Sequence, residues 1–269
     1  MTNEEFFAGV ERYVSLARRE LHARWDQWEF DPVQAEMHES VGGLMARQVT
    51  LTNNLALSPG VWNGHAAPLF LRAMIDVYIT FAWICDDPVE RAQKFISYGL
   101  GQEKLHLEHF KNDIRDEVED VESHPAVEAR RSWIDSQRYT FLTEVDVGSW
   151  SGKSTRAMAD EAGCMNIYRH AYQPFSSATH SMWNHVGKYN LQPCENALHG
   201  YHLVPVDAPL EADVDFLYRS AKYVNKTFNR FDKMTNTEVE VESCFQVLVD
   251  LLETLDQEGI EYEESKSGE

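Results

Sequence analysis

EEFFAGVERYVSLARRELHARWDQW, residues 4–28, carries the pattern that decides the fold. Its apolar side chains recur at steps of three and four residues, which places them on one helical face: Phe6, Val10, Tyr13, Val14, Ala17, Leu21 and Trp25. The opposite face is charged. At 3.6 residues per turn, the segment predicts an amphipathic helix of about six or seven turns. Its apolar face needs other helices to cover it.

The same spacing continues along the chain. It predicts further helices over residues 31–57, 67–85, 89–118, 125–143, 211–234 and 238–255. Asp31 and Pro32 are typical of an N-cap and a first helical residue, and Ser58-Pro59-Gly60 is typical of a helix end. We therefore predict an all-α fold, a multi-helix bundle in which residues 1–255 form a single helical domain.

Three segments depart from this pattern. Residues 190–208 combine prolines, a glycine and short apolar runs, which favours a small irregular loop or hairpin. Residues 113–125 are rich in Asp and Glu, which indicates a solvated helix end and linker. Residues 256–269 are acidic and contain few apolar side chains, so we expect a flexible tail there.

The helix expected at residues 67–85 is apolar nearly all round. A membrane span is the alternative, because the run is barely long enough to cross a bilayer. Arg72 and Asp76 lie inside it, and charged side chains are costly in hydrocarbon. We therefore expect a central buried helix and no membrane partner.

Arg72 and Asp76 stand four residues apart on one face of that helix. Burying either charge alone would be costly, so the two should form an ion pair. One interpretation is a structural pair that fixes the register of the helix. The other is that both residues line an internal polar pocket together with residues 168–184.

Composition limits the class of protein. The 269 residues carry a formal net charge of −20, which argues against coating nucleic acid or anionic lipid by bulk electrostatics. A nucleic acid would need a local cationic pocket. The four cysteines lie far apart without a C-x-x-C pair, which favours reduced thiols. The acidic N-terminus lacks the basic region and apolar core of a secretion signal, so we expect a cytoplasmic protein.

GSWSGKS, residues 148–154, is similar to a phosphate loop. Only three residues separate its glycines where the P-loop pattern requires four, so we favour a helix-capping turn made by Ser151 or Ser154. Lys153 and Arg156 would then lie at the first turn of a helix, where free N–H groups attract anions. They are candidate anion-binding or substrate-binding residues.

The sequence contains no complete metal site. Glu103 and His106 form one E-x-x-H element, whereas a di-iron bundle needs two such elements and two further carboxylates. Four histidines without a neighbouring carboxylate or Cys pattern could gather around zinc: His180, His185, His199 and His202. We predict no metal and no cofactor.

Three blocks carry a family resemblance. They read LFLRAMIDVYITFAWICDDPVERAQKFISYG (69–99), WSGKSTRAMADEAG (150–163) and IYRHAYQPFSSATH (167–180). In this order they resemble the uncharacterised bacterial domain-of-unknown-function family 5677, over roughly residues 40–190. The resemblance implies an all-helical fold, and the last block is similar to the final helix of HEPN-type domains. Those bundles often dimerise, and many are metal-independent endoribonucleases of toxins and phage-defence systems.

The active motif of HEPN-type enzymes is an Arg followed after four to six residues by His. His180 matches the histidine, but residues 174–176 are Pro, Phe and Ser where the Arg should stand, and Arg169 is ten intervening residues away. A substitute cation from Arg72 or Arg156 could restore the chemistry. An imidazole would then handle the proton of a ribose hydroxyl, and the Arg would stabilise the charge on phosphorus.

The leading hypothesis is a bacterial defence or stress protein that acts on RNA or a nucleotide through a HEPN-like, metal-independent endoribonuclease-type pocket. The predicted catalytic residues are His180, Arg72 and Asp76, and the predicted anion-binding or substrate-binding residues are Lys153, Arg156 and Arg169. The alternative is a catalytically silent helical module that binds a partner protein or its own copy. A homodimer is expected from the resemblance.

Overall fold

Helix α1 (Asn3–Gln27) in the computed structural model confirms the pattern of the N-terminal segment. Thr2 caps it by accepting a hydrogen bond from the backbone N–H of Glu5, whose carboxylate accepts one from the N–H of Thr2 in return. Its apolar face is buried, with Tyr13 and Ala17 fully inaccessible to solvent. The first helix therefore begins and ends where its caps and apolar spacing predict.

The structure describes residues 1–137, 149–207 and 209–267, without the side chains of residues 258–267. It is mostly helical, with one small antiparallel hairpin. The remaining α-helices are α2 (Ala35–Ala56), α3 (Ala67–Asp86), α4 (Pro88–Ile114), α5 (Pro125–Ser136), α6 (Thr155–Glu161), α7 (Met165–Ile167), α8 (Gln173–Thr179), α9 (Trp183–Tyr189), α10 (Asp215–Thr235) and α11 (Cys244–Ser267). The other elements are η1 (Pro32–Gln34), η2 (Pro59–Val61), η4 (Tyr168–Tyr172), β1 (Leu191–Pro193) and β2 (Leu203–Pro205).

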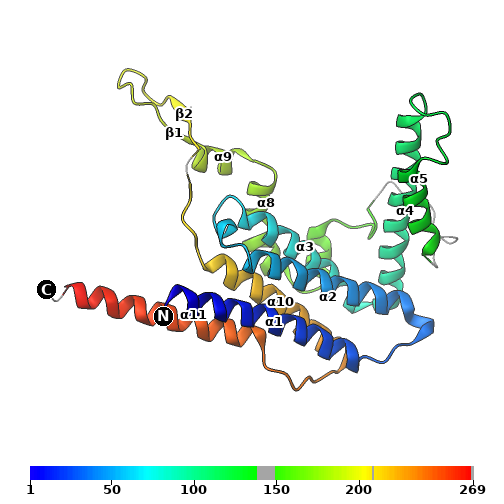
Figure 1. Cartoon of the computed structure of the whole chain (residues 1–269), viewed down its shortest axis with the longest axis horizontal. Helices are drawn as coiled ribbons and strands as arrows, with labels where there is room; N and C mark the ends of the chain where they lie inside the picture. The colour runs from blue at the N-terminus through cyan, green and yellow to red at the C-terminus, as the bar shows by residue number, and fades with distance from the viewer. Residues whose placement is uncertain (138–148, 208, 268–269) are drawn as a thin grey trace.

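Helix α3 lies at the centre of the bundle, packed between α2 and α10 (Figure 1). Leu71, Met74, Ile75 and Ile79 are completely buried there. By length and composition alone α3 is also long and apolar enough to cross a membrane, and it is half-buried in this structure. The core explains its apolar character without reference to a bilayer. One continuous apolar cluster joins it to α1, α2, α10 and α11.

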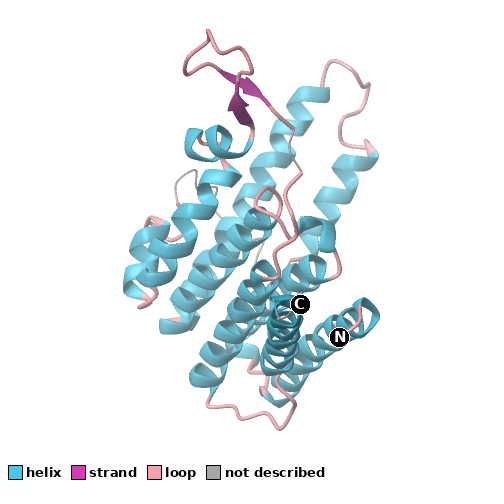
Figure 2. Cartoon of the chain, turned by 90° about the vertical axis from the view of Figure 1, so that its left-hand side faces the viewer, coloured by secondary structure: helices cyan, strands magenta, loops and turns pink. Residues whose placement is uncertain are grey.

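Two limbs project from this bundle on the same side (Figure 1). One is the pair α4 and α5, which has a small apolar cluster of its own made by Leu107, Val127 and Ile134. The other carries α8, α9 and the hairpin, whose strands lie at the end of the limb (Figure 2). The hairpin pairs Leu191 with Pro205 and Pro193 with Leu203, so a hairpin in residues 190–208 is confirmed.

Several element boundaries differ from the predicted ones. Asp31 caps Val33 as expected, but the chain first makes the 3₁₀ turn η1 before α2 begins at Ala35. The helix predicted over residues 125–143 ends earlier, at Ser136, because Gln137 already has an extended backbone conformation; residues 138–143 lie outside the described residues. Helix α11 continues to Ser267, where the sequence predicts a flexible tail at 256–269.

The entry to α2 yields a prediction about pH. His38 is buried against the rings of Trp25 and Trp28, whose centroids lie 4.0 and 4.4 Å from its own. Desolvation lowers the pKa of His38 below its ordinary value of 6.5, although a hydrogen bond to the Trp28 backbone opposes this shift. The unfolded chain therefore binds this proton more readily, and stability should fall as the pH drops below about 6.5.

The measurement is urea unfolding of the wild type and of His38→Gln across that pH range. The wild type should lose more free energy of unfolding between neutral pH and the lowered pKa than the variant loses. Equal losses in the two proteins would show that His38 does not contribute to the pH dependence.

Candidate functional site

The predicted ion pair between Arg72 and Asp76 is present on α3. The side chain of Arg72 is 11% exposed, whereas that of Asp76 is 47% exposed, so the pair lies at the edge of the core. Desolvation raises the pKa of Asp76, and the neighbouring guanidinium opposes that shift. The two residues are therefore paired as expected, and Asp76 is the more exposed member of the pair.

Arg72 also contacts the segment that follows α7. Its Nε donates to the hydroxyl of Ser176 at 2.8 Å, and its guanidinium lies over the ring of Tyr172, 3.5 Å from the centroid. Such stacking is a favourable cation–π contact. Arg72 and residues of the 168–184 segment thus meet as the second interpretation requires.

The serine-rich turn caps a helix. Ser154 is the N-cap of α6 and accepts a hydrogen bond from the backbone N–H of Ala157. The ammonium of Lys153 forms an ion pair with Glu161 at 2.5 Å, and the other oxygen of Glu161 accepts from the indole of Trp83. Lys153 therefore neutralises a carboxylate of its own chain. Arg156 is exposed on α6.

The remaining predicted residues lie on the surface. Arg169 is exposed on η4, and His180 is exposed at the C-terminal end of α8. The backbone turns sharply after His180, because Ser181 has the left-handed φ of 49°. The structure thus brings Arg72 and Asp76 together, and within the described residues no hydrogen bond or ion pair joins Lys153, Arg156, Arg169 or His180 to them.

A groove of about 330 Å³ opens between α10 and the segment that contains α7 and η4. This volume is at the lower end of the range for small-ligand sites. The groove is lined by Asn166, Ile167, His170, Ala171, Asp215, Tyr218, Arg219, Lys222, Tyr223 and Lys226. Among the described residues that line the groove, none is one of the six residues that the sequence predicted for the site.

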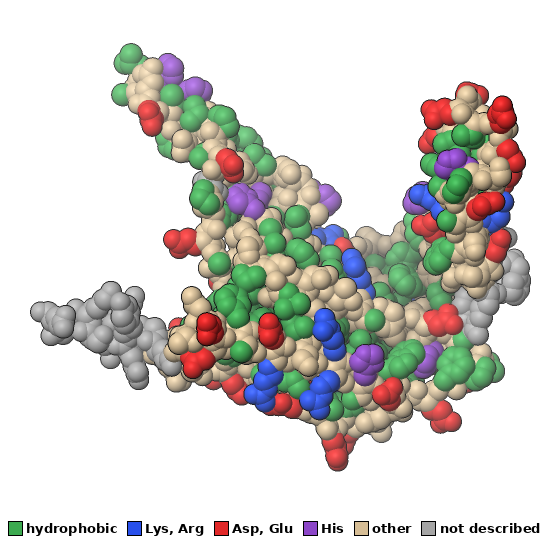
Figure 3. Space-filling view, in the orientation of Figure 1, with side chains coloured by type: hydrophobic (Ala, Val, Ile, Leu, Met, Phe, Trp, Pro, Cys, Tyr) green, Lys and Arg blue, Asp and Glu red, His purple; other side chains and the backbone are tan. Residues whose placement is uncertain are grey.

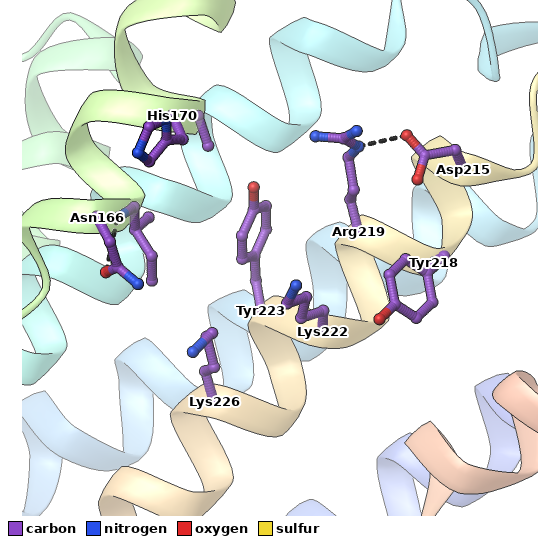
Figure 4. Close-up of a pocket in the computed structure, with 10 residues that line it drawn as sticks. Asn166, His170, Asp215, Tyr218, Arg219, Lys222, Tyr223 and Lys226 are labelled. Carbon is purple, nitrogen blue, oxygen red and sulfur yellow. Dashed lines mark hydrogen bonds and ion pairs between the residues drawn. The ribbon is translucent and has the colours of Figure 1, made fainter.

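One wall of the groove is a basic stripe on α10, made by Arg219, Lys222 and Lys226 (Figure 4). Steps of three and four residues place them on one helical face. Asp215 is the only carboxylate among the lining residues, and it pairs with Arg219 at 2.5 Å. Within the described residues, neither lysine has a carboxylate partner.

The facing wall contributes polar groups of a different kind. Figure 4 shows His170 and Asn166 opposite the stripe, and the hydroxyl of Tyr223 pointing into the space between His170 and Arg219. Burial raises the pKa of Tyr223 to about 12, against the smaller opposing effect of Arg219. At neutral pH the phenol is therefore protonated and can donate a hydrogen bond.

His170 and Ala171 lie in a π-helical turn, because η4 has wider hydrogen bonding than an α-helix. The N–H of Gln173 donates to the carbonyl of Tyr168, five residues earlier. Pro174 explains this turn: it has no N–H to donate to the carbonyl of His170, and its ring would collide with a regular α-turn. Single π-turns of this kind are frequent at functional sites.

The groove combines cations, a neutral phenol and an imidazole, which is the donor set that binds phosphate oxygens. It lies in a chain of formal net charge −20. Figure 3 shows Asp and Glu side chains crowding the tip of the α4–α5 limb, while Lys and Arg side chains gather on the front of the bundle. Sequence reasoning missed the groove, although the basic spacing of residues 219, 222 and 226 was a usable signal.

Comparison with known proteins gives a match to one family model. Neither the curated proteins nor the solved structures contain a match to this chain. A family model does match, over residues 38–197, and that range extends from α2 into the hairpin. It covers more than half of the chain and includes the His170 wall of the groove. The chain therefore belongs to DUF5677, a family of unknown function.

Proposed function

We propose that this protein is a HEPN-like helical protein of bacterial defence or stress that binds RNA or a nucleotide through the groove between α10 and η4. The observation that carries the proposal is the basic stripe of Arg219, Lys222 and Lys226, which faces His170 across the groove. The HEPN-like core and the biological role rest on the sequence resemblance. The groove supplies the binding chemistry.

Charge supports this assignment. Three cations and one carboxylate line the groove in a chain of formal net charge −20. Keeping two lysines without carboxylate partners on one face costs electrostatic repulsion, which a bound phosphate would relieve. The general acidity of the chain would then repel phosphate elsewhere and limit binding to this groove.

An aromatic side chain makes a nucleotide unit a better fit than inorganic phosphate. Tyr218 lines the groove beside Lys222, whose ammonium lies 5.7 Å from the centre of its ring. Bases stack on such rings in many single-strand binding sites, with cations holding the backbone. We therefore place the phosphate on the basic stripe and a base near Tyr218.

Binding is tested by titrating the purified chain with a fluorescently labelled single-stranded RNA and, separately, with ATP. If all three cations contact phosphates, the slope of log affinity against log salt should be about −2 for single-stranded RNA, from about −0.7 per contact. Tight RNA binding with weak ATP binding identifies the polymer as ligand, and the reverse identifies the nucleotide. Absence of both kinds of binding would contradict the proposal.

Cleavage of RNA is the catalytic part of the proposal. It requires an imidazole that takes the proton of a ribose 2′-hydroxyl beside a phosphate held by cations. His180 is the residue that the HEPN resemblance implies, and His170 is the one in the groove. The position of His170 opposite the basic stripe favours it as the general base.

We predict that the purified chain cleaves RNA in EDTA and leaves 2′,3′-cyclic phosphate ends. His170→Ala should lower the rate by about 100-fold or more, the usual contribution of a general acid or base, while remaining folded by circular dichroism. His180→Ala is the matched comparison, because it removes the other candidate imidazole. If only His180→Ala loses activity, then His180, the residue predicted from the sequence, is the general base and His170 is not.

The same assays test the alternative function. A catalytically silent module that binds a partner protein or its own copy would neither bind RNA in a salt-dependent way nor cleave it. Light scattering coupled to gel filtration would then measure whether the chain forms the expected homodimer. A dimer without RNA or nucleotide binding would favour the scaffold.

A further inference from the structure

The tip of the hairpin gathers three potential metal ligands. Cys194, His199 and His202 each offer one donor atom, and the three atoms all lie within 4.8 Å of one another. Figure 3 shows His side chains near the end of this limb. We propose that Cys194, His199 and His202 bind a zinc ion that closes the loop between β1 and β2.

The hairpin backbone holds two of these residues opposite each other. Pro193 pairs with Leu203 at the last rung, and the N–H of Cys194 donates to the carbonyl of His202 at 2.9 Å. Directly opposed side chains on paired strands lie close enough to share a ligand. Cys194 and His202 therefore lie opposite each other where the loop leaves the two strands.

A turn inside the loop places His199 beside Cys194 and His202. The N–H of His202 donates to the carbonyl of His199, and the two rings lie 5.4 Å apart. The Nδ1 atom of His199 is 3.7 Å from the sulfur of Cys194, while its Nε2 faces the amide of Asn196 at 3.1 Å. Nδ1 is thus the ring nitrogen that faces the thiol.

These separations suit zinc. Bonds of about 2.0 Å to nitrogen and 2.3 Å to sulfur in a tetrahedron place two nitrogens about 3.3 Å apart and a nitrogen about 3.5 Å from the sulfur. The 3.7 Å between the sulfur of Cys194 and Nδ1 of His199 is close to the second value. A set of one thiolate and two imidazoles favours zinc over magnesium or calcium, which prefer oxygen. The thiol releases its proton to solvent on binding, and the fourth position is left to water.

The loop has no apolar core of its own. Leu198 and Tyr201, its large apolar side chains, are 91% and 106% exposed, so no apolar core forms there. Tyr201 has a left-handed φ of 64°, a costly conformation for a bulky residue. Two short strands alone are marginal in water. A metal that links Cys194 and His202 across the mouth of the loop would supply what packing does not.

The remaining cysteines are poorer ligands. Burial raises the pKa of Cys85 to about 12 and that of Cys164 to about 11, with the charge of Arg230 opposing both shifts. Cys244 is fully buried. Cys194 is therefore the thiol best placed for a metal.

The test uses the full chain, freed of metal and kept reduced, with Zn²⁺ alone and Co²⁺ alone as probes. Calorimetry should give one Zn²⁺ per chain with a Kd of about 1 µM or tighter. Co²⁺ should develop the visible ligand-field bands of a tetrahedral site and a thiolate charge-transfer band. Cys194→Ser should abolish the charge-transfer band, and His199→Ala or His202→Ala should each weaken binding at least about 10-fold.

His185→Ala and Cys85→Ser are the matched controls, because each removes a ligand type outside the loop, and both should bind like the wild type. Absence of stoichiometric Zn²⁺ binding, or unchanged binding in the Cys194→Ser/His199→Ala/His202→Ala variant, would overturn the proposal. The result is independent of the groove, since RNA binding and cleavage in EDTA test only the α10 site.

Discussion

Replacing Arg24 by Met should lower the free energy of unfolding by about 3–5 kcal/mol. Arg24 and Glu20 are each only 5% exposed, and their ion pair measures 2.8 Å. The guanidinium also binds both oxygens of Asp232, at 2.8 and 2.9 Å, and lies 4.3 Å from the ring centre of Phe228. Met fills most of the volume but leaves the Glu20 carboxylate buried without its cation.

Glu20 makes a second contact, which decides the choice of the control variant. Its other oxygen accepts a hydrogen bond from the backbone N–H of Cys244 at 2.6 Å, where α11 begins. Glu20→Gln combined with Arg24→Met keeps an acceptor for that N–H and removes the stranded charge, so it should recover about 1–3 kcal/mol. Urea unfolding at neutral pH measures both variants.

A comparison with an exposed pair tests the cause. Arg12 and Glu242 form an ion pair whose side chains are 59% and 49% exposed, so Arg12→Met should cost less than about 1 kcal/mol. A similarly small loss in Arg24→Met would contradict the buried network. That result would mean that solvent reaches Glu20 once the guanidinium is gone.

The sequence predicted most helices because their apolar residues repeat with a helical period. Helices α1 and α3 begin and end close to the expected residues, where proline and capping side chains mark the boundaries. The sequence did not predict the Arg24–Asp232 pair, because its members are 208 residues apart and meet only when α10 packs near α1. Long-range pairing of this kind has no local signal.

The candidate site was less predictable for the same reason. Its His170 wall and its basic wall lie more than forty residues apart in the chain, and the packing of α10 brings them together. The family motif drew attention to His180, which the structure leaves exposed at the end of α8. The sequence predicted the hairpin, but the zinc hypothesis drawn from it grouped His199 and His202 with His180 and His185 and left out Cys194.

Reversing the charge of both unpaired lysines should have the largest effect on ligand binding. Each ammonium–phosphate hydrogen bond contributes about 2 kcal/mol, so Lys222→Glu/Lys226→Glu should weaken RNA or nucleotide binding about 1,000-fold. Both side chains lie on the open side of α10 and make no ion pair with the residues described, so the fold should be retained. Circular dichroism and urea unfolding check that condition.

Arg18→Glu/Arg19→Glu is the matched control. It makes the same change in net charge on the exposed face of α1, and neither residue lines the groove. General repulsion between an acidic protein and phosphate would weaken binding equally in the two double variants. Binding at a specific site in the groove would weaken the affinity of Lys222→Glu/Lys226→Glu much more than that of Arg18→Glu/Arg19→Glu.

The most direct test of the groove is therefore a fluorescence titration of labelled single-stranded RNA, and of ATP, into the wild type and these two double variants at fixed ionic strength. The account predicts that at least one of these ligands binds, that Lys222→Glu/Lys226→Glu loses about 1,000-fold in affinity, and that Arg18→Glu/Arg19→Glu stays within about 10-fold of the wild type. Equal affinities in the two folded variants, or no binding by the wild type, would contradict the claim that this groove is the binding site.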